Sequence, residues 1–88
     1  AIKWHYLAAG QGLGKAQNNL AVGYEYGAGV LQNYVMAYMW YSLAASNGTE
    51  GSSKWQNEVA LLMTPEEISN AQGMAGECVQ SNYQKCGN

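Results

Sequence analysis

Small and aromatic residues recur at helical spacing in the middle of the chain. Between residues 34 and 48 they occupy positions i, i+3, i+4, i+7 and i+8, and they are Ala37, Trp40, Tyr41, Ala44 and Ala45. This spacing places them on one stripe of a helix. Gly48 follows, and glycine readily adopts the left-handed conformation that ends many helices. The pattern predicts a helix over residues 34–48 with one buried stripe.

The same pattern occurs earlier in the chain. The segment WYSLAASNG at residues 40–48 closely matches WHYLAAGQG at residues 4–12, and the offset is 40 − 4 = 36 residues. Self-similarity at a fixed interval of a few tens of residues is typical of stacked structural repeats. We therefore expect residues 1–12 to form a helix equivalent to residues 34–48.

A second type of helix is predicted between these two copies. Ala16, Leu20 and Tyr24 recur at i, i+4 and i+8, which predicts a helix from about Lys15 to Tyr26. The segment GAGVLQN at residues 27–33 then supplies two glycines where this helix must end and the chain must turn. The two helix types alternate, and small residues on both would let antiparallel helices approach closely.

The pattern is weaker after Gly48. Trp55, Val59 and Leu62 lie at i, i+4 and i+7, so they predict a shorter helix from about Ser52 to Met63 with these three residues on one face.

The segment TPEE marks the strongest helix boundary in the chain. Thr64 can act as the N-cap, Pro65 suits the first helical position, and Glu67 can complete a capping box. Apolar residues follow on one helical stripe, namely Ile68, Ala71, Ala75, Cys78 and Val79. A last helix is therefore predicted from Pro65 to about Asn82, as a terminal cap on the stacked repeats.

The composition argues against nucleic acid and membrane insertion. The chain has 88 residues, enough for one domain, and six Asp plus Glu against four Lys plus Arg give a formal net charge of −2. It offers no basic stripe for phosphate contacts. No apolar run approaches the roughly 18 to 20 residues that span a bilayer. Because the sequence begins inside the repeated segment, we expect further repeats and any targeting segment to lie upstream.

Two cysteines, Cys78 and Cys86, lie near the C-terminal end of the sequence. They could form a disulfide, a redox pair or part of a metal site. Two thiols without further Cys or His cannot complete a structural zinc site, and the spacing is not Cys-x2-Cys, so a structural disulfide is favoured. Continuous helix would hold the two Cα atoms about 12 Å apart, whereas a disulfide needs roughly 4.4 to 6.8 Å, so the helix must end near Ser81 or Asn82. A disulfide favours an oxidising compartment, such as a bacterial periplasm or the extracellular space.

No set of catalytic residues stands out in the sequence. His5 is the only histidine, and it occupies the position that Tyr41 holds in the other copy, which favours a packing or helix-surface role. Trp4 and Trp40 fall on the stripe that must be buried, which favours a core role over a sugar- or base-stacking platform. We predict no catalytic residue, metal site or cofactor, and we expect that the chain is not an enzyme.

Residues 16–48, AQNNLAVGYEYGAGVLQNYVMAYMWYSLAASNG, closely resemble a Sel-one-like repeat. The family motif is Ala-x3-Leu-Gly-x2-Tyr-x2-Gly-x-Gly-Val, a polar stretch, and then Ala-x2-Trp-x3-Ala-Ala-x2-Gly. The matching positions are Ala16, Leu20, Tyr24, Gly27, Gly29, Val30, Ala37, Trp40, Ala44, Ala45 and Gly48. Ala21 replaces one motif glycine but keeps a small side chain there. The interval of 36 residues is also that of the family, and it differs from the 34 residues of the related tetratricopeptide repeat.

The resemblance implies an all-α fold, an α/α superhelix (solenoid) of antiparallel helix pairs similar to tetratricopeptide repeats, with a C-terminal capping helix. It divides residues 1–88, taken as a single domain, into the second helix of a truncated repeat (1–12), a complete repeat (15–48), and a degenerate repeat with the cap (49–88). It also implies a non-catalytic scaffold that binds a peptide or protein. The alternative is an enzyme or binder acting on cell-wall or β-lactam compounds, a role linked with cysteine-rich relatives.

In such superhelices the first helix of each pair lines the concave side, so we expect the partner there. The core stripe of residues 15–26 faces inward, and the neighbouring stripe that would meet the partner consists of Lys15, Asn18, Val22 and Glu25. The helix at residues 1–12 would lack the packing partner that a preceding repeat provides. Its apolar patch, formed by Trp4, Leu7 and Ala8, predicts self-association through that end.

Overall fold

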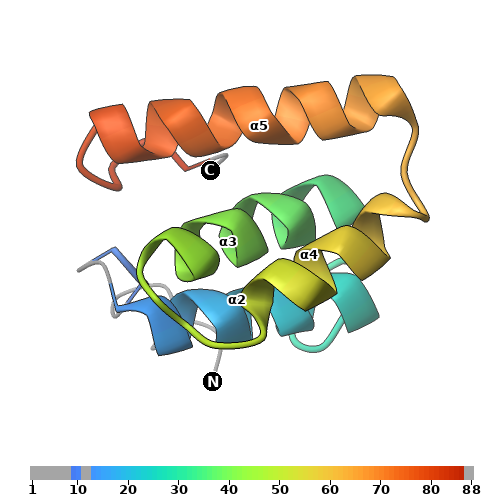
Figure 1. Cartoon of the computed structure of the whole chain (residues 1–88), viewed down its shortest axis with the longest axis horizontal. Helices are drawn as coiled ribbons and strands as arrows, with labels where there is room; N and C mark the ends of the chain where they lie inside the picture. Colours follow the sequence, from blue (N-terminus) through green and yellow to red (C-terminus); the bar gives the residue numbers. More distant parts are fainter. Residues whose placement is uncertain (1–8, 11–12, 87–88) are drawn as a thin grey trace.

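The computed structural model describes residues 9, 10 and 13–86, and this part of the chain is helical with no strand. Four α-helices follow one another, and they are α2 (Gly14–Tyr26), α3 (Tyr34–Ser46), α4 (Ser52–Ala60) and α5 (Pro65–Gln80). Successive helices run in opposite directions (Figure 1). The all-α prediction is confirmed. The predicted helix at residues 1–12 and the residues Trp4, His5, Leu7 and Ala8 lie outside the described residues, apart from Ala9 and Gly10.

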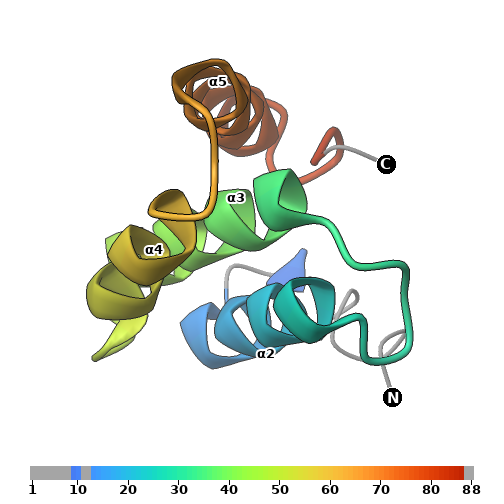
Figure 2. The ribbon, with the colours of Figure 1, turned by 90° about the vertical axis from the view of Figure 1, so that its right-hand side faces the viewer.

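Helix α3 lies in the middle of the fold. It packs against α2, α4 and α5, with α2 and α5 on opposite sides of it (Figures 1 and 2). Six consecutive residues, 36–41, are buried, and at 3.6 residues per turn they sweep the whole circumference of the helix. The prediction of one buried stripe was therefore too narrow, because Met36, Tyr38, Met39 and Leu43 are also buried. A helix that is apolar on every side is stable only in the interior.

Local signals fix both ends of the α2–α3 connection. Gly27 ends α2 in the left-handed conformation with φ 69°, and the N–H of Ala28 donates to the carbonyl of Gly23 at 2.8 Å. Asn33 begins α3 as an N-cap, and its side chain accepts a hydrogen bond from the N–H of Met36 at 3.1 Å. These caps satisfy backbone groups that a helix leaves unpaired at its ends. Helix α3 ends at Ser46, two residues before the predicted end.

Helix α4 is shorter than predicted. It ends at Ala60 rather than Met63, because the N–H groups of residues 61–63 donate to carbonyls three residues earlier, which tightens the chain into a turn. This change of pitch moves Leu62 off the face that buries Val59, so that 60 % of Leu62 is exposed. Trp55 is 40 % exposed as well. Of the three residues predicted on one helix face, only Val59 is buried.

The capping box at the start of α5 is present. The hydroxyl of Thr64 accepts from the N–H of Glu67 at 3.1 Å, and the carboxylate of Glu67 accepts from the N–H of Thr64 at 2.8 Å. On α5, Ala71, Ala75 and Cys78 are buried, whereas Val79, predicted on the same apolar stripe, is 52 % exposed. Helix α5 packs mainly on α3, so it buries a narrow stripe.

A disulfide joins Cys78 and Cys86, with the two Cα atoms 4.4 Å apart. Helix α5 ends at Gln80, just before the predicted stop. The chain then reverses through two residues with positive φ, Asn82 at 56° and Tyr83 at 66°. The N–H of Tyr83 donates to the carbonyl of Cys78 at 2.7 Å, so the disulfide closes a compact, hydrogen-bonded loop.

A buried polar side chain connects this loop to the rest of the fold. Gln17 of α2 has no exposed surface, and its amide nitrogen donates to the carbonyl of Ala9 at 3.2 Å. Its amide oxygen accepts from Nδ2 of Asn47 at 2.9 Å, and the same nitrogen lies 3.3 Å from the hydroxyl of Tyr83. Gln17 and Asn47 thus link four segments of the chain: the residues before α2, α2 itself, the end of α3 and the C-terminal loop.

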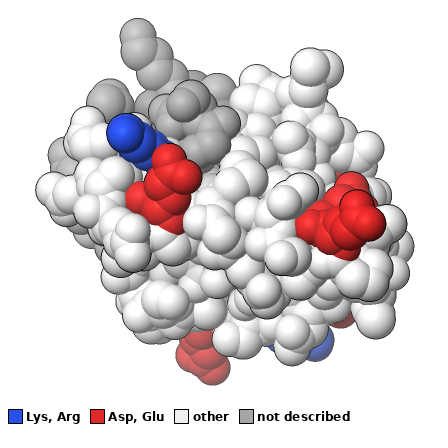
Figure 3. All heavy atoms as spheres, turned by 90° about the horizontal axis from the view of Figure 1, so that it is seen from above, with Lys and Arg blue, Asp and Glu red and all other residues white. Residues whose placement is uncertain are grey.

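Two surface properties follow from these helices. Within the described residues, no helix combines the length and apolarity needed to cross a membrane. On the face that carries α5, charged side chains are few and are separated by wide uncharged areas (Figure 3).

Candidate partner-binding groove

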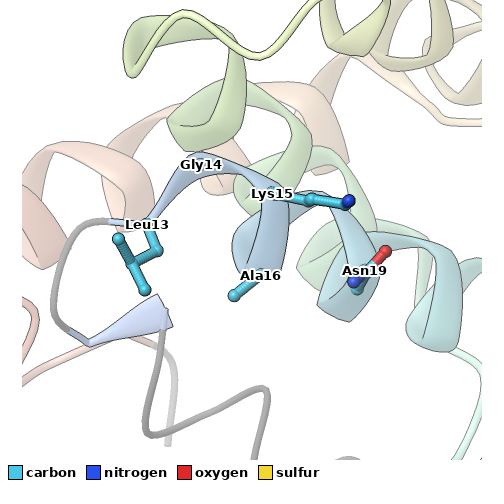
Figure 4. Close-up of a pocket in the computed structure, with 5 residues that line it drawn as sticks. All are labelled: Leu13, Gly14, Lys15, Ala16 and Asn19. Carbon is cyan, nitrogen blue, oxygen red and sulfur yellow. The ribbon is translucent and has the colours of Figure 1, made fainter.

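The predicted partner-binding stripe does not lie on one continuous surface. Lys15 is exposed near the start of α2 and lines a cavity of about 490 Å³ together with four neighbours, Leu13, Gly14, Ala16 and Asn19. In Figure 4, Leu13 and Ala16 extend to one side of α2, while the polar ends of Lys15 and Asn19 lie further along the helix. Among the described residues, the lining of this cavity comes from the first part of α2 and from Leu13 just before it.

Asn18, the second residue of that stripe, is held between two helices. Its side-chain oxygen accepts a hydrogen bond from the hydroxyl of Ser52 at 2.8 Å. Ser52 is fully buried at the start of α4, so this bond fixes α4 against α2. Asn18 therefore has a structural partner within the chain.

The last two residues of the stripe, Val22 and Glu25, line a second cavity of about 190 Å³. We call this cavity the α2–α4 groove. Its other lining residues come from α2, α3 and α4, and they are Tyr26, Tyr41, Trp55 and Glu58. In Figure 2, α2 and α4 lie on the same side of α3, which agrees with the Ser52–Asn18 hydrogen bond between them.

Helical spacing explains how the groove is lined. Val22, Glu25 and Tyr26 lie at i, i+3 and i+4 on α2, and Trp55 and Glu58 lie at i and i+3 on α4, so each set projects from one helix face. The groove combines aromatic rings with carboxylates from two helices.

Glycine sets the position of the Trp55 ring. Gly51 precedes α4 with φ 89°, and its carbonyl accepts from the N–H of Trp55 at 3.2 Å. A Cβ atom at Gly51 would lie 3.3 Å from the Trp55 ring, so the ring rests directly against this residue. The ring also lies near Tyr41, with ring centroids 6.3 Å apart and an interplanar angle of 46°. Trp55 is thus fixed in the groove while part of its surface meets solvent.

A short hydrogen bond lies in the groove. The hydroxyl of Tyr41 donates to the carboxylate of Glu25 at 2.6 Å, the length of a charge-assisted bond. Burial raises the pKa of Tyr41, and the hydrogen bond to Glu25 and the negative charges of Glu25 and Glu58 raise it further. Tyr41 therefore stays a neutral donor, and the negative charge in the groove belongs to the two glutamates.

Only part of this groove was expected from the sequence. Val22 and Glu25 belong to the predicted partner-binding stripe, Tyr41 was placed on a buried stripe and is indeed 1 % exposed, and Trp55 and Glu58 were given no role in binding. The i, i+3 spacing of Trp55 and Glu58 was a readable signal, because it places a carboxylate on the same helix face as Trp55 and carboxylates are rarely buried without a partner.

The described residues show no arrangement suited to a metal ion. No group of three or more His, Cys, Asp or Glu side chains comes together among residues 9, 10 and 13–86. His5 lies outside this range. The described residues that line the groove supply two carboxylates, aromatic rings and an aliphatic side chain.

Helices that alternate in direction and repeat at an interval of 36 residues define a helical repeat protein related to the tetratricopeptide repeat. The Sel1 repeat, the family that the sequence resembles, matches residues 1–13 and 14–49, which is more than half of the chain. The chain therefore belongs to the Sel1 repeat family. Sel1 repeats generally mediate protein–protein interactions, and the family is typically a non-enzymatic interaction scaffold. No curated protein matches the chain significantly.

Proposed function

We propose that this chain is a non-catalytic scaffold that binds a peptide or protein where α2 and α4 lie side by side. The observation that supports this most directly is the α2–α4 groove, because it exposes 72 % of Tyr26 and 40 % of Trp55. Aromatic residues are enriched in protein interfaces, where they provide a large contact area at low entropic cost. Family membership supports the same role.

The proposal extends to the architecture around the groove. Helices α2 and α3 form one antiparallel pair, α4 takes the place of the first helix of the next pair, and α5, which packs on α3, is the C-terminal cap. Ser52 supports this assignment of α4, since it lies 52 − 16 = 36 residues after Ala16 and both are buried. Continuation of these pairs would give a superhelix whose concave side is lined by α2 and α4.

The disulfide supports a location for this scaffold. Disulfides persist in oxidising compartments and are rare in the cytosol. We place the protein in a bacterial periplasm or outside the cell, on the basis of the Cys78–Cys86 disulfide.

Site-specific photocrosslinking tests the proposed surface. A photoreactive amino acid replaces Val22 in the groove or, as a matched control, Val79 on the exposed side of α5. The variant at Val22 should crosslink to partner proteins in the native compartment, and reversal of the charge of Glu25 should abolish that crosslink. Equal capture by the Val79 control would contradict the proposed surface. Hydrolysis of β-lactam or cell-wall compounds that is lost on Glu25→Gln would contradict a non-catalytic role.

A further inference from the structure

The size of the α2–α4 groove limits what can enter it. Its volume of about 190 Å³ is below the range of about 300 to 1,000 Å³ typical of small-molecule and cofactor pockets. The groove is open to solvent along its rim, where Tyr26 and Trp55 are exposed. These dimensions fit one long side chain that projects from a partner.

The charge of the groove is negative. Glu25 and Glu58 line it, and none of the described residues that line it is a lysine or arginine. Both carboxylates line the same cavity as the Tyr41 hydroxyl, and their negative charges contribute to its raised pKa. Tyr41 donates to one oxygen of Glu25, and a carboxylate can accept further hydrogen bonds on its remaining lone pairs. The groove should therefore bind most tightly to a cationic group that has several hydrogen-bond donors.

The aromatic rings of the groove favour arginine over lysine as the cationic side chain that enters it. The ring of Trp55 is fixed by Gly51 on one side and borders Tyr41, so it presents a preformed surface. A guanidinium group is planar, stacks on aromatic faces and can bind a carboxylate through two parallel hydrogen bonds. A lysine ammonium is more strongly hydrated and offers no planar face. A groove with both a fixed indole and carboxylates is therefore more complementary to arginine.

We propose that the α2–α4 groove receives an arginine side chain of the partner, stacked on Trp55 and hydrogen-bonded to Glu25 and Glu58. This inference rests on the proposed scaffold function and specifies the chemistry that the groove recognises. Arginine then acts as the anchor, and residues on either side of it in the partner extend along α2 and α4.

An NMR titration of the 88-residue chain tests this proposal. The probes are three capped tripeptides, acetyl-Gly-X-Gly-amide, in which X is arginine, lysine or citrulline. Citrulline keeps the planar shape of arginine but carries no charge. The indole N–H resonance of Trp55, assigned with Trp55→Phe, should shift saturably with the arginine peptide. Binding should be about fivefold or more weaker for citrulline, with lysine between the two.

Isosteric variants locate the site. Glu58→Gln and Glu25→Gln each remove one negative charge, and the glutamine at position 25 can still accept the hydrogen bond from Tyr41. Each should weaken arginine binding about threefold or more, whereas Glu77→Gln on the exposed side of α5 should leave it unchanged. Amide spectra that overlay on that of the parent chain confirm that each variant is folded.

Several results would overturn the proposal: no saturable shift of Trp55, equal binding of citrulline and arginine, or equal weakening by Glu77→Gln. The two proposals fail separately. A partner that crosslinks at Val22 while the arginine peptide does not bind removes the arginine inference alone. An arginine peptide that binds while Val22 captures no partner removes the scaffold role and leaves an arginine site.

Discussion

Reduction of the Cys78–Cys86 disulfide should destabilise the fold by an amount that can be calculated. The two cysteines are eight residues apart, and the loop-entropy model gives about 2.5 kcal/mol for a loop of this length. A domain of this size loses about 4 to 8 °C of Tm for each kcal/mol, so reduction should lower Tm by roughly 10 to 20 °C.

Thermal unfolding followed by circular dichroism, with and without a phosphine reductant, measures this difference. Alkylation and intact mass establish how many thiols are free in each sample. The double variant Cys78→Ala/Cys86→Ala is the control, and its Tm should not respond to the reductant. A reduced sample with two free thiols and a Tm within about 2 °C of the oxidised sample would refute the reasoning, since the loop would then be held equally well by its hydrogen bonds.

Three further predictions concern single positions. Gly73→Ala should stabilise the protein by about 0.5 to 1 kcal/mol, because a Cβ atom at this helical position meets open space. Gly14→Ala should destabilise the protein, because its new Cβ atom would overlap the turn after α3. Urea denaturation of the two variants and the parent chain measures both changes. Stability should decrease above about pH 10, the unperturbed pKa of tyrosine, because the raised pKa of Tyr41 means that unfolding releases its proton there. Tyr41→Phe should reduce this slope in denaturation curves at different pH, and an unchanged slope would assign it to other groups. Gln17→Leu should cost about 1 to 3 kcal/mol, because the carbonyl of the buried Ala9 loses its hydrogen bond from Gln17 and Nδ2 of Asn47 loses one of its acceptors. A loss below about 0.5 kcal/mol in urea denaturation would contradict this.

The helix ends were the most predictable part of the fold. The capping box at Thr64 and the left-handed turn at Gly27 depend on residues within one turn of the chain, so a short segment contains the whole signal. The end of α4 was not predictable in this way. The helical spacing of apolar residues in α4 continues to Leu62. The backbone nevertheless changes at residue 61 to hydrogen bonds between residues three apart, which form the turn that leads to Pro65.

Burial was less predictable than helix location, because it depends on how many neighbours a helix has. Periodicity identified one stripe on α3, whereas three packing partners bury it on all sides. The same reasoning overestimated burial on α5, where Val79 is exposed because α5 packs mainly on one helix.

The groove required tertiary structure. Val22 and Glu25 could be chosen from the spacing on α2 alone. Their neighbours Tyr41, Trp55 and Glu58 come from helices that lie later in the chain, and only packing on α3 brings them to the same place. The arrangement that gives the groove its charge and its aromatic surface could not be read from any one segment.

The central position of α3 has a consequence for the modularity of this chain. The family match ends at residue 49, which suggests a unit that could be cut there and recombined with other repeats. The flanks of α3 that α4 and α5 cover are apolar, so a chimera joined after residue 49 would carry a helix that needs a matching neighbour from the new sequence. The unit of sequence inheritance and the unit of cooperative folding therefore differ, and a transferable module of this protein includes every helix from α2 to α5.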